Sequence, residues 1–198
     1  RPDFGSRVTV VPQAERASRL REMNEEDLEG IARLEGELFG AEAWSRGLLA
    51  AELEVSRGPW ADRRYVVVES DEAHGADTGG QRATLLGYAG LYHARGLAGA
   101  DLLTIATVPA ARRRGLASLM LTELVGTARW AGCPEVLLEV RQSNEAAQRL
   151  YARHGFVTIA RRRRYYRAPP EDAVVMRLML RPRPGPVGMS EISEASSG

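Results

Sequence analysis

The chain has 198 residues, of which 44% are apolar and 27% charged, and 27 basic against 26 acidic residues give a net charge of +1. This length is enough for one compact domain with a sizeable core, and the near-neutral balance excludes a general affinity for polyanions while allowing a local basic patch. The one cysteine, Cys133, excludes an internal disulfide and a cysteine-based metal cluster. No apolar run reaches the roughly 18 residues of a membrane span and no signal peptide is apparent, so we expect a soluble cytoplasmic protein.

Three segments of the chain differ in composition. Residues 1–17 are polar with little pattern, and residues 181–198 are rich in Pro, Gly and Ser with too few apolar residues to fold. Residues 18–180 contain no internal repeat and no second linker. We therefore predict an N-terminal extension, a single folded domain over 18–180 and a disordered C-terminal tail.

The first half of the folded segment is predicted to contain two helices and several strands. Residues 18–23 are a short strand candidate, and Asn24 with Asp27 three residues later caps a helix that carries apolar residues at helical spacing. Residues 45–55 predict a second, weaker helix. Further strands are predicted at 65–69, 85–93 and 102–108, with residues 71–82 as a hairpin loop.

The second half alternates helices with strands. A helix is predicted at 115–131, a strand at 135–140 and a helix at 144–154 that Gly155 ends, followed by strands at 156–161 and 173–180. A meander of strands followed by this alternation predicts an α/β fold, in which one mixed, mostly antiparallel sheet of six to seven strands has helices on both faces. The apolar face of the helix at 115–131 is predicted to comprise Leu116, Leu119, Met120, Leu124 and Ala128.

A turn rich in arginine joins the strand at 102–108 to the following helix. In Arg112-Arg113-Arg114-Gly115-Leu116-Ala117, small residues stand at a helix N-terminus, where unpaired backbone N–H groups and the helix dipole favour an anion. No Gly-Lys-Ser/Thr follows and a third glycine is missing, which excludes a Walker A loop and a dinucleotide fingerprint. From these residues alone, an ordinary helix start with solvated arginines is an equally open interpretation.

At this point the sequence resembles the GNAT acetyltransferase superfamily, whose coenzyme-binding motif is Gln/Arg-x-x-Gly-x-Gly/Ala between the fourth strand and third helix. The motifs LEVR at 138–141, SNEAA at 143–147 and LYxxxGF at 150–156 resemble one branch, the ribosomal-protein alanine N-acetyltransferases of RimI type. The resemblance extends to Trp44-Ser45, Thr104-Ile105-Ala106, Arg164-Tyr165-Tyr166, Asp172-Ala173 and Met176, and spans roughly residues 18–180. It departs at Ala117, where a second glycine is commoner, and at Val108, where relatives often have Asp.

The resemblance implies a site for acetyl-CoA as co-substrate, without a metal. The backbone of Ile105, Ala106 and Thr107 would bind the pantetheine arm as an added strand, and Asn144 would contact the coenzyme near the thioester. The pyrophosphate would be wrapped by Arg113, Arg114, Gly115, Leu116, Ala117 and Ser118.

The resemblance also implies that Glu139 is the general base, that Tyr151 is the general acid, and that Tyr165 and Tyr166 hold the incoming peptide. Structural alternatives stay open for each: Glu139 alternates with apolar residues and would otherwise pair with an arginine, and Tyr151 would otherwise be a core aromatic. Asn144 is also a possible helix N-cap, a role compatible with coenzyme contact.

Other reactive residue types are given structural interpretations. The three histidines, at 74, 93 and 154, have no ligand spacing, and no base is placed near Cys133, which argues against an acetyl-cysteine intermediate. The run Arg161–Arg164 is interpreted as a solvated strand end, so nucleic-acid binding is not expected.

The predicted reaction is direct attack of a primary amine on the thioester. The resemblance favours the N-terminal α-amine of a protein as acceptor, with the alanine N-terminus of a small-subunit ribosomal protein as the specific expectation, and a monomer or weak dimer as the enzyme. Two alternatives remain: acetylation of a small-molecule amine or a lysine by the same fold, and a non-catalytic acyl-CoA-binding module.

Overall fold

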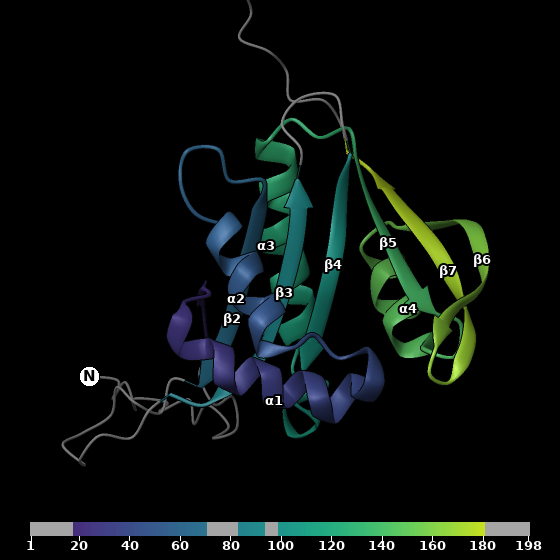
Figure 1. The fold of residues 1–198 in the computed structure, drawn as a ribbon. Helices are drawn as coiled ribbons and strands as arrows, with labels where there is room; N and C mark the ends of the chain where they lie inside the picture. Colours follow the sequence, from purple (N-terminus) through teal and green to yellow (C-terminus); the bar gives the residue numbers. More distant parts are fainter. Residues whose placement is uncertain (1–17, 71–82, 94–98, 181–198) are drawn as a thin grey trace, which may run out of the picture.

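A computed structural model describes residues 18–70, 83–93 and 99–180. Within these ranges the chain forms one seven-stranded sheet of order β1-β2-β3-β4-β5-β7-β6 (Figure 1). The predicted hairpin loop at 71–82 and the predicted extension and tail lie outside the described residues. The strands are β1 (Ser18–Glu22), β2 (Arg63–Ser70), β3 (Leu85–His93), β4 (Ala100–Thr107), β5 (Glu135–Arg141), β6 (Val157–Arg167) and β7 (Pro170–Met179).

The sequence predicts side-chain caps ahead of α1 and α4, and the structure adds one at α2, whereas α3 has none. Asn24 and Asp27 form a capping box around the short 3₁₀ turn that precedes α1, and Ser45 accepts a hydrogen bond from the backbone N–H of Leu48 at 3.2 Å. Asn144 caps α4 through the backbone N–H of Ala147 at 3.1 Å. The helices are α1 (Leu28–Phe39), α2 (Arg46–Val55), α3 (Leu116–Trp130) and α4 (Glu145–Arg153).

Helices cover both faces of the sheet, as predicted (Figure 1). Because side chains alternate across a strand, β2 sends Tyr65 and Val67 to the core under α1 and α2, and Val66 and Val68 to the core under α3. None of the helices within the described ranges combines the length and apolar character needed to cross a membrane.

The sheet opens between β4 and β5, and this opening positions the site. The two strands are parallel and pair only at Ala100 with Val136 and at Asp101 with Leu137. Beyond these pairs they diverge, while β4 stays paired to β3 through Thr107 and β5 to β7 through Arg141 (Figure 1). The far half of β4 therefore has an unpaired backbone edge facing β5.

Two of the element predictions are corrected by the structure. Leu119 was placed on the buried face of α3 but is 42% exposed, because the buried stripe instead turns through Leu121 and Val125. The strand predicted at 156–161 continues to Arg167, since an edge strand needs only β7 as partner and its side chains can be exposed arginines.

Candidate active site

The unpaired edge of β4 carries the residues predicted to bind pantetheine. Ile105, Ala106 and Thr107 pair with β3 on one side, so the backbone groups that alternate with these hydrogen bonds point toward the opening. An extended, amide-containing chain can satisfy such an edge as an added strand does. The structure thus brings together an open strand edge and the three residues expected there.

The turn after β4 ends in an N-terminus suited to an anion. Gly115 precedes α3 with a φ of 78°, and Arg113 has a φ of 61°, a conformation that non-glycine residues rarely adopt. No side chain caps α3, so the first backbone N–H groups, those of Leu116, Ala117 and Ser118, have no cap partner. A Cβ on Gly115 would meet nothing within 4 Å, so the approach to these amides is open. This geometry fits a pyrophosphate.

Ser118 also joins α3 to α4. Its hydroxyl oxygen lies 2.6 Å from Nε2 of His154, the residue that follows α4. From the sequence alone, His154 is expected to have a structural role. In the structure this histidine connects Ser118, a predicted phosphate-binding residue, to the helix that carries Tyr151. The turn of residues 113–118, called the phosphate turn below, is therefore connected directly to α4 across the opening.

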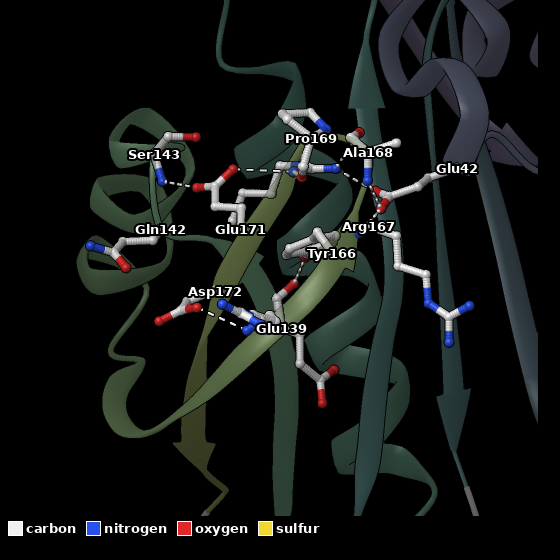
Figure 2. Close-up of polar contacts among 12 residues, drawn as sticks. Glu42, Glu139, Gln142, Ser143, Tyr166, Arg167, Ala168, Pro169, Glu171 and Asp172 are labelled. Carbon is white, nitrogen blue, oxygen red and sulfur yellow. Dashed lines mark hydrogen bonds and ion pairs between the residues drawn. The ribbon is translucent and has the colours of Figure 1, made fainter.

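Glu139 lies on β5 beside the opening. Val136, Leu138 and Val140 are buried, whereas Leu137, Glu139 and Arg141 on the opposite face are half-buried, as the alternation predicts. Arg162 lies 3.2 Å from the Glu139 carboxylate, which is the arginine pair of the structural alternative. The backbone carbonyl of Glu139 accepts a hydrogen bond from the Tyr166 hydroxyl at 3.4 Å (Figure 2). Glu139 thus combines a partly accessible carboxylate with contacts to the β6–β7 hairpin.

Tyr151 is a buried residue of α4 whose ring packs on Phe156 with centroids 5.8 Å apart. Burial raises the pKa of its phenol, and the neighbouring Tyr166 adds to the effect. The phenol is therefore protonated at neutral pH. The core-aromatic alternative and the predicted proton donor remain compatible, because a buried ring can still present its hydroxyl to a site.

Tyr165 and Tyr166 come from the end of β6, where the strand bulges at Arg164. Their rings meet edge to face at 5.2 Å, with Tyr165 exposed and Tyr166 half-buried. Burial, together with Tyr165 and nearby carboxylates, raises the pKa of Tyr166 to about 12. Tyr166 therefore presents a neutral phenol beside Glu139.

A polar network that the sequence reasoning missed centres on Arg141. Its guanidinium contacts the carboxylates of Glu42 and of Glu171, the latter at 3.1 Å, and lies 4.1 Å from the Tyr166 ring centroid. Figure 2 shows Glu42 reaching from the α1–α2 connection to the backbone of Arg167 and Ala168 in the β6–β7 turn. Arg141 belongs to the LEVR motif, but its partners are too distant in sequence to be recognised there.

A second carboxylate that the sequence analysis missed, that of Glu35, holds the α1–α2 connection in place. Glu35 of α1 is buried and accepts hydrogen bonds from the backbone N–H of Trp44 at 2.7 Å and from the Tyr88 hydroxyl. The Tyr88 hydroxyl also lies 3.2 Å from Oγ1 of Thr104 on β4. Burial raises the pKa of Glu35 against the lowering effect of these hydrogen bonds. This network ties the Trp44-Ser45 segment to the open strand.

Two pockets of the described chain lie away from this opening. One of about 580 Å³ is lined by residues of α1 and the start of β3, and one of about 560 Å³ by Arg63, Arg64 and Trp130 among others. Neither contains Glu139, Tyr151 or the phosphate turn. Within the described ranges, no cluster of three or more His, Cys, Asp or Glu side chains has the geometry of a metal site.

Comparison with known proteins shows the family of the chain. The profile of the acetyltransferase (GNAT) family matches residues 24–156. The chain belongs to the GNAT family of acetyltransferases. Membership implies acetyl-CoA as co-substrate, consistent with the open β4 edge and the N-terminus of α3.

Relatives within the GNAT family include N-terminal acetyltransferases. The chain is 37% identical over 147 residues to the N-alpha-acetyltransferase RimI of Mycobacterium tuberculosis, covering 72% of this chain and 89% of that protein. It is 42% identical over 84 residues to the bS18 alanine N-acetyltransferase of Haemophilus ducreyi, covering 41% and 58%. The crystal structure of the ribosomal-protein-S18-alanine N-acetyltransferase from Escherichia coli superposes with a TM-score of 0.64 at 26% identity, covering 82% of this chain and 94% of that one.

Proposed function

We propose that this GNAT acetyltransferase modifies the N-terminal α-amine of a protein, with the alanine N-terminus of small-subunit ribosomal protein bS18 as its acceptor. The observation that carries the proposal is the divergence of β4 and β5 beside Glu139, with tyrosines of the β6–β7 hairpin at the same place. The names of the relatives described above support the choice of acceptor.

Coenzyme binding is assigned to one side of the opening. The backbone of Ile105, Ala106 and Thr107 hydrogen-bonds the pantetheine amides, and a β4 N–H group polarises the thioester oxygen. The residues from Arg113 to Ser118 hold the pyrophosphate through amide groups and guanidinium side chains. Asn144 caps α4 while its exposed side contacts the coenzyme.

Glu139 and Tyr151 are assigned the two proton transfers. Glu139, directly or through a water, accepts a proton from the acceptor ammonium, so that the neutral amine attacks the thioester carbon. The new C–N bond forms as the C–S bond breaks and Tyr151 gives its proton to the departing sulfur. The proton that the nitrogen loses on becoming an amide returns to the Tyr151 oxygen. The raised pKa of Tyr151 keeps its phenol protonated at neutral pH. It also makes the phenol a weaker acid than a thiol of pKa near 8.5, so the proton moves to sulfur only together with return of the nitrogen's proton to the phenol oxygen.

The chemistry suits an α-amine without requiring one. An N-terminal amine has a pKa near 7.8 and a lysine side chain near 10.4, so deprotonation at pH 7.4 costs roughly 0.5 kcal/mol for the first and about 4 kcal/mol for the second. One carboxylate readily assists the smaller task. The acceptor preference therefore has to be measured directly.

The decisive experiment is a mass-spectrometric screen with acetyl-CoA and peptides that differ in their first residues. We expect acetylation of the α-amine of peptides beginning with alanine. A matched peptide with a blocked N-terminus and an internal lysine serves as the control and should stay unmodified. Preferential acetylation of that lysine, or of free small amines, would replace the proposed acceptor, and no transfer to any amine would support a non-catalytic acyl-CoA-binding module.

A further inference from the structure

Arg141 connects four segments that surround the acceptor side of the opening. Its own strand is β5, and its guanidinium contacts Glu42 in the α1–α2 connection, Glu171 of β7, and the backbone carbonyls of Ala168 and Pro169 at 3.1 and 3.3 Å. Glu171 in turn accepts the backbone N–H of Ser143, ahead of α4, at 2.5 Å. One side chain thus holds together elements that are far apart in the sequence.

Glu42 bonds both Arg141 and the backbone of the β6–β7 turn. It accepts the backbone N–H groups of Arg167 at 2.7 Å and of Ala168 at 3.3 Å in addition to Arg141 (Figure 2). Burial acts to raise the pKa of Glu42, but these hydrogen bonds and the arginine outweigh it and lower the pKa. Glu42 is therefore ionised at neutral pH and attaches the α1–α2 connection to the β6–β7 turn.

The same guanidinium fixes the position of an aromatic ring at Glu139. Its centre lies 4.1 Å from the Tyr166 centroid, within the range of a cation–π contact, and the Tyr166 hydroxyl donates to the Glu139 carbonyl at 3.4 Å. Only arginine offers a planar face for stacking together with several donors in its plane. Tyr166 therefore links the side chain of Arg141 to the backbone of Glu139.

We propose that Arg141 is a positioning residue for acceptor binding. Arg141 joins Glu42 to the β6–β7 turn and stacks on Tyr166. It thereby holds the α1–α2 connection and the β6–β7 hairpin, the two walls of the acceptor side, in place next to Glu139. This inference rests on the proposed function, in which that side admits a peptide N-terminus. It predicts a defect confined to the acceptor, because within the described residues no side-chain contact of Arg141 reaches the phosphate turn or the β4 edge. Its bond to Asn144, a proposed coenzyme contact, is made by the Arg141 backbone carbonyl, which a substitution leaves in place.

The test compares steady-state kinetics of wild type, R141Q, R141K and E42Q with a short alanine-starting peptide and acetyl-CoA. We expect R141Q to raise the peptide KM at least about tenfold, as the loss of charge-assisted hydrogen bonds implies, and to leave acetyl-CoA affinity by calorimetry within about twofold. R141K keeps the positive charge but lacks the planar set of donors and the stacking on Tyr166. Its peptide KM should therefore lie between those of wild type and R141Q. E42Q removes one wall contact alone and should also raise the peptide KM.

Arg21 provides a matched control for the loss of a two-carboxylate arginine. Its side chain is 26% exposed, against 23% for Arg141, and it bonds Asp27 and Glu69 at 2.7–2.8 Å far along the sheet. R21Q should lower the melting temperature while leaving the peptide KM unchanged. Equal effects of R21Q and R141Q on the peptide KM, or a matching loss of acetyl-CoA affinity in R141Q, would overturn the role of Arg141. Wild-type turnover with the peptide tests the proposed function separately, since the role of Arg141 is judged from ratios of variant to wild type.

Discussion

Glu139 is the residue on which the proposed deprotonation of the acceptor amine depends. Glu139→Gln keeps the size of the side chain and removes the base, so we expect kcat with an alanine-starting peptide to fall about 100-fold or more at neutral pH. A more alkaline buffer should restore part of the rate, because more of the acceptor amine is then neutral without help. The pH profile of kcat for the two proteins measures this.

Glu135 is a matched control on the same strand and the same face. Its side chain is 27% exposed, as is that of Glu139, and it also pairs with one arginine, Arg177, at 3.7 Å. Glu135→Gln should leave kcat and its pH profile unchanged. A comparable decrease in both variants would assign the effect of Glu139→Gln to loss of strand packing or charge.

Single residues also show what the sequence could reveal. The alternation in β5 correctly separated Val136, Leu138 and Val140 from the face of Glu139 and Arg141, because side-chain period is a local property. The contact between Arg141 and Glu42 joins residues 99 positions apart, and no local pattern encodes such a pair. Motif matching found Arg141 but could not supply its partners.

At the scale of elements, the N-terminus of α3 has a conformational requirement that can be tested. Gly115→Ala should destabilise the fold by about 1–2 kcal/mol, since the φ of 78° disfavours a Cβ although no atom obstructs it. It should also weaken acetyl-CoA binding, because relaxing that strain moves the first amides of the helix. Chemical unfolding and calorimetry measure the two effects.

Gly132, just beyond the other end of α3, provides a control that distinguishes the cost of backbone strain from an effect on acetyl-CoA binding. It has a φ of 80°, and a Cβ there would also meet nothing within 4 Å. Gly132→Ala should cost a similar free energy of unfolding and leave acetyl-CoA affinity unchanged. Equal weakening of acetyl-CoA binding by both substitutions would remove the phosphate turn from the proposed site.

The attachment of the β6–β7 hairpin to the α1–α2 connection should weaken in acid. The hairpin's contacts hold the pKa of Glu42 below its ordinary value of 4.5, so the folded state binds fewer protons than the unfolded chain in this range. This stability is fully present above about pH 5 and is lost as the pH falls through the lowered pKa. The free energy of unfolding lost in Glu42→Gln should therefore be largest at neutral pH and shrink toward about pH 3.

Glu145 offers the control for this acid effect. It pairs with Arg149 on the exposed surface of α4, where an ion pair contributes little to stability. The difference in free energy of unfolding between Glu145→Gln and wild type should stay small and nearly constant from neutral to acid pH. A deficit in Glu42→Gln that did not diminish in acid would show that its carboxylate does not act through its charge.

Element boundaries were predictable where local chemistry sets them. The caps at Asn24 and Asn144 and the stop at Gly155 were visible because each acts within a few residues. The extent of β6 was not, since its arginines lack an apolar pattern and the strand is held only by its register with β7. The divergence of β4 from β5 likewise depends on pairing between distant segments.

At the scale of the whole molecule, acetyl-CoA should act as a connection between the two halves of the sheet. The β4–β5 pairs at one end and the Ser118–His154 contact leave the rest of the opening without strand pairing. A ligand that binds only the folded state at about 100 times its Kd adds about 2.7 kcal/mol, equivalent to a melting-temperature increase of roughly 5–10 °C for a chain of this length. Hydrogen exchange should slow at residues 105–107 and 116–118 together with α4, because in the proposed site the coenzyme contacts both sides of the opening. Protection restricted to one side, or stabilisation with no protection at β4, would place acetyl-CoA elsewhere on the molecule.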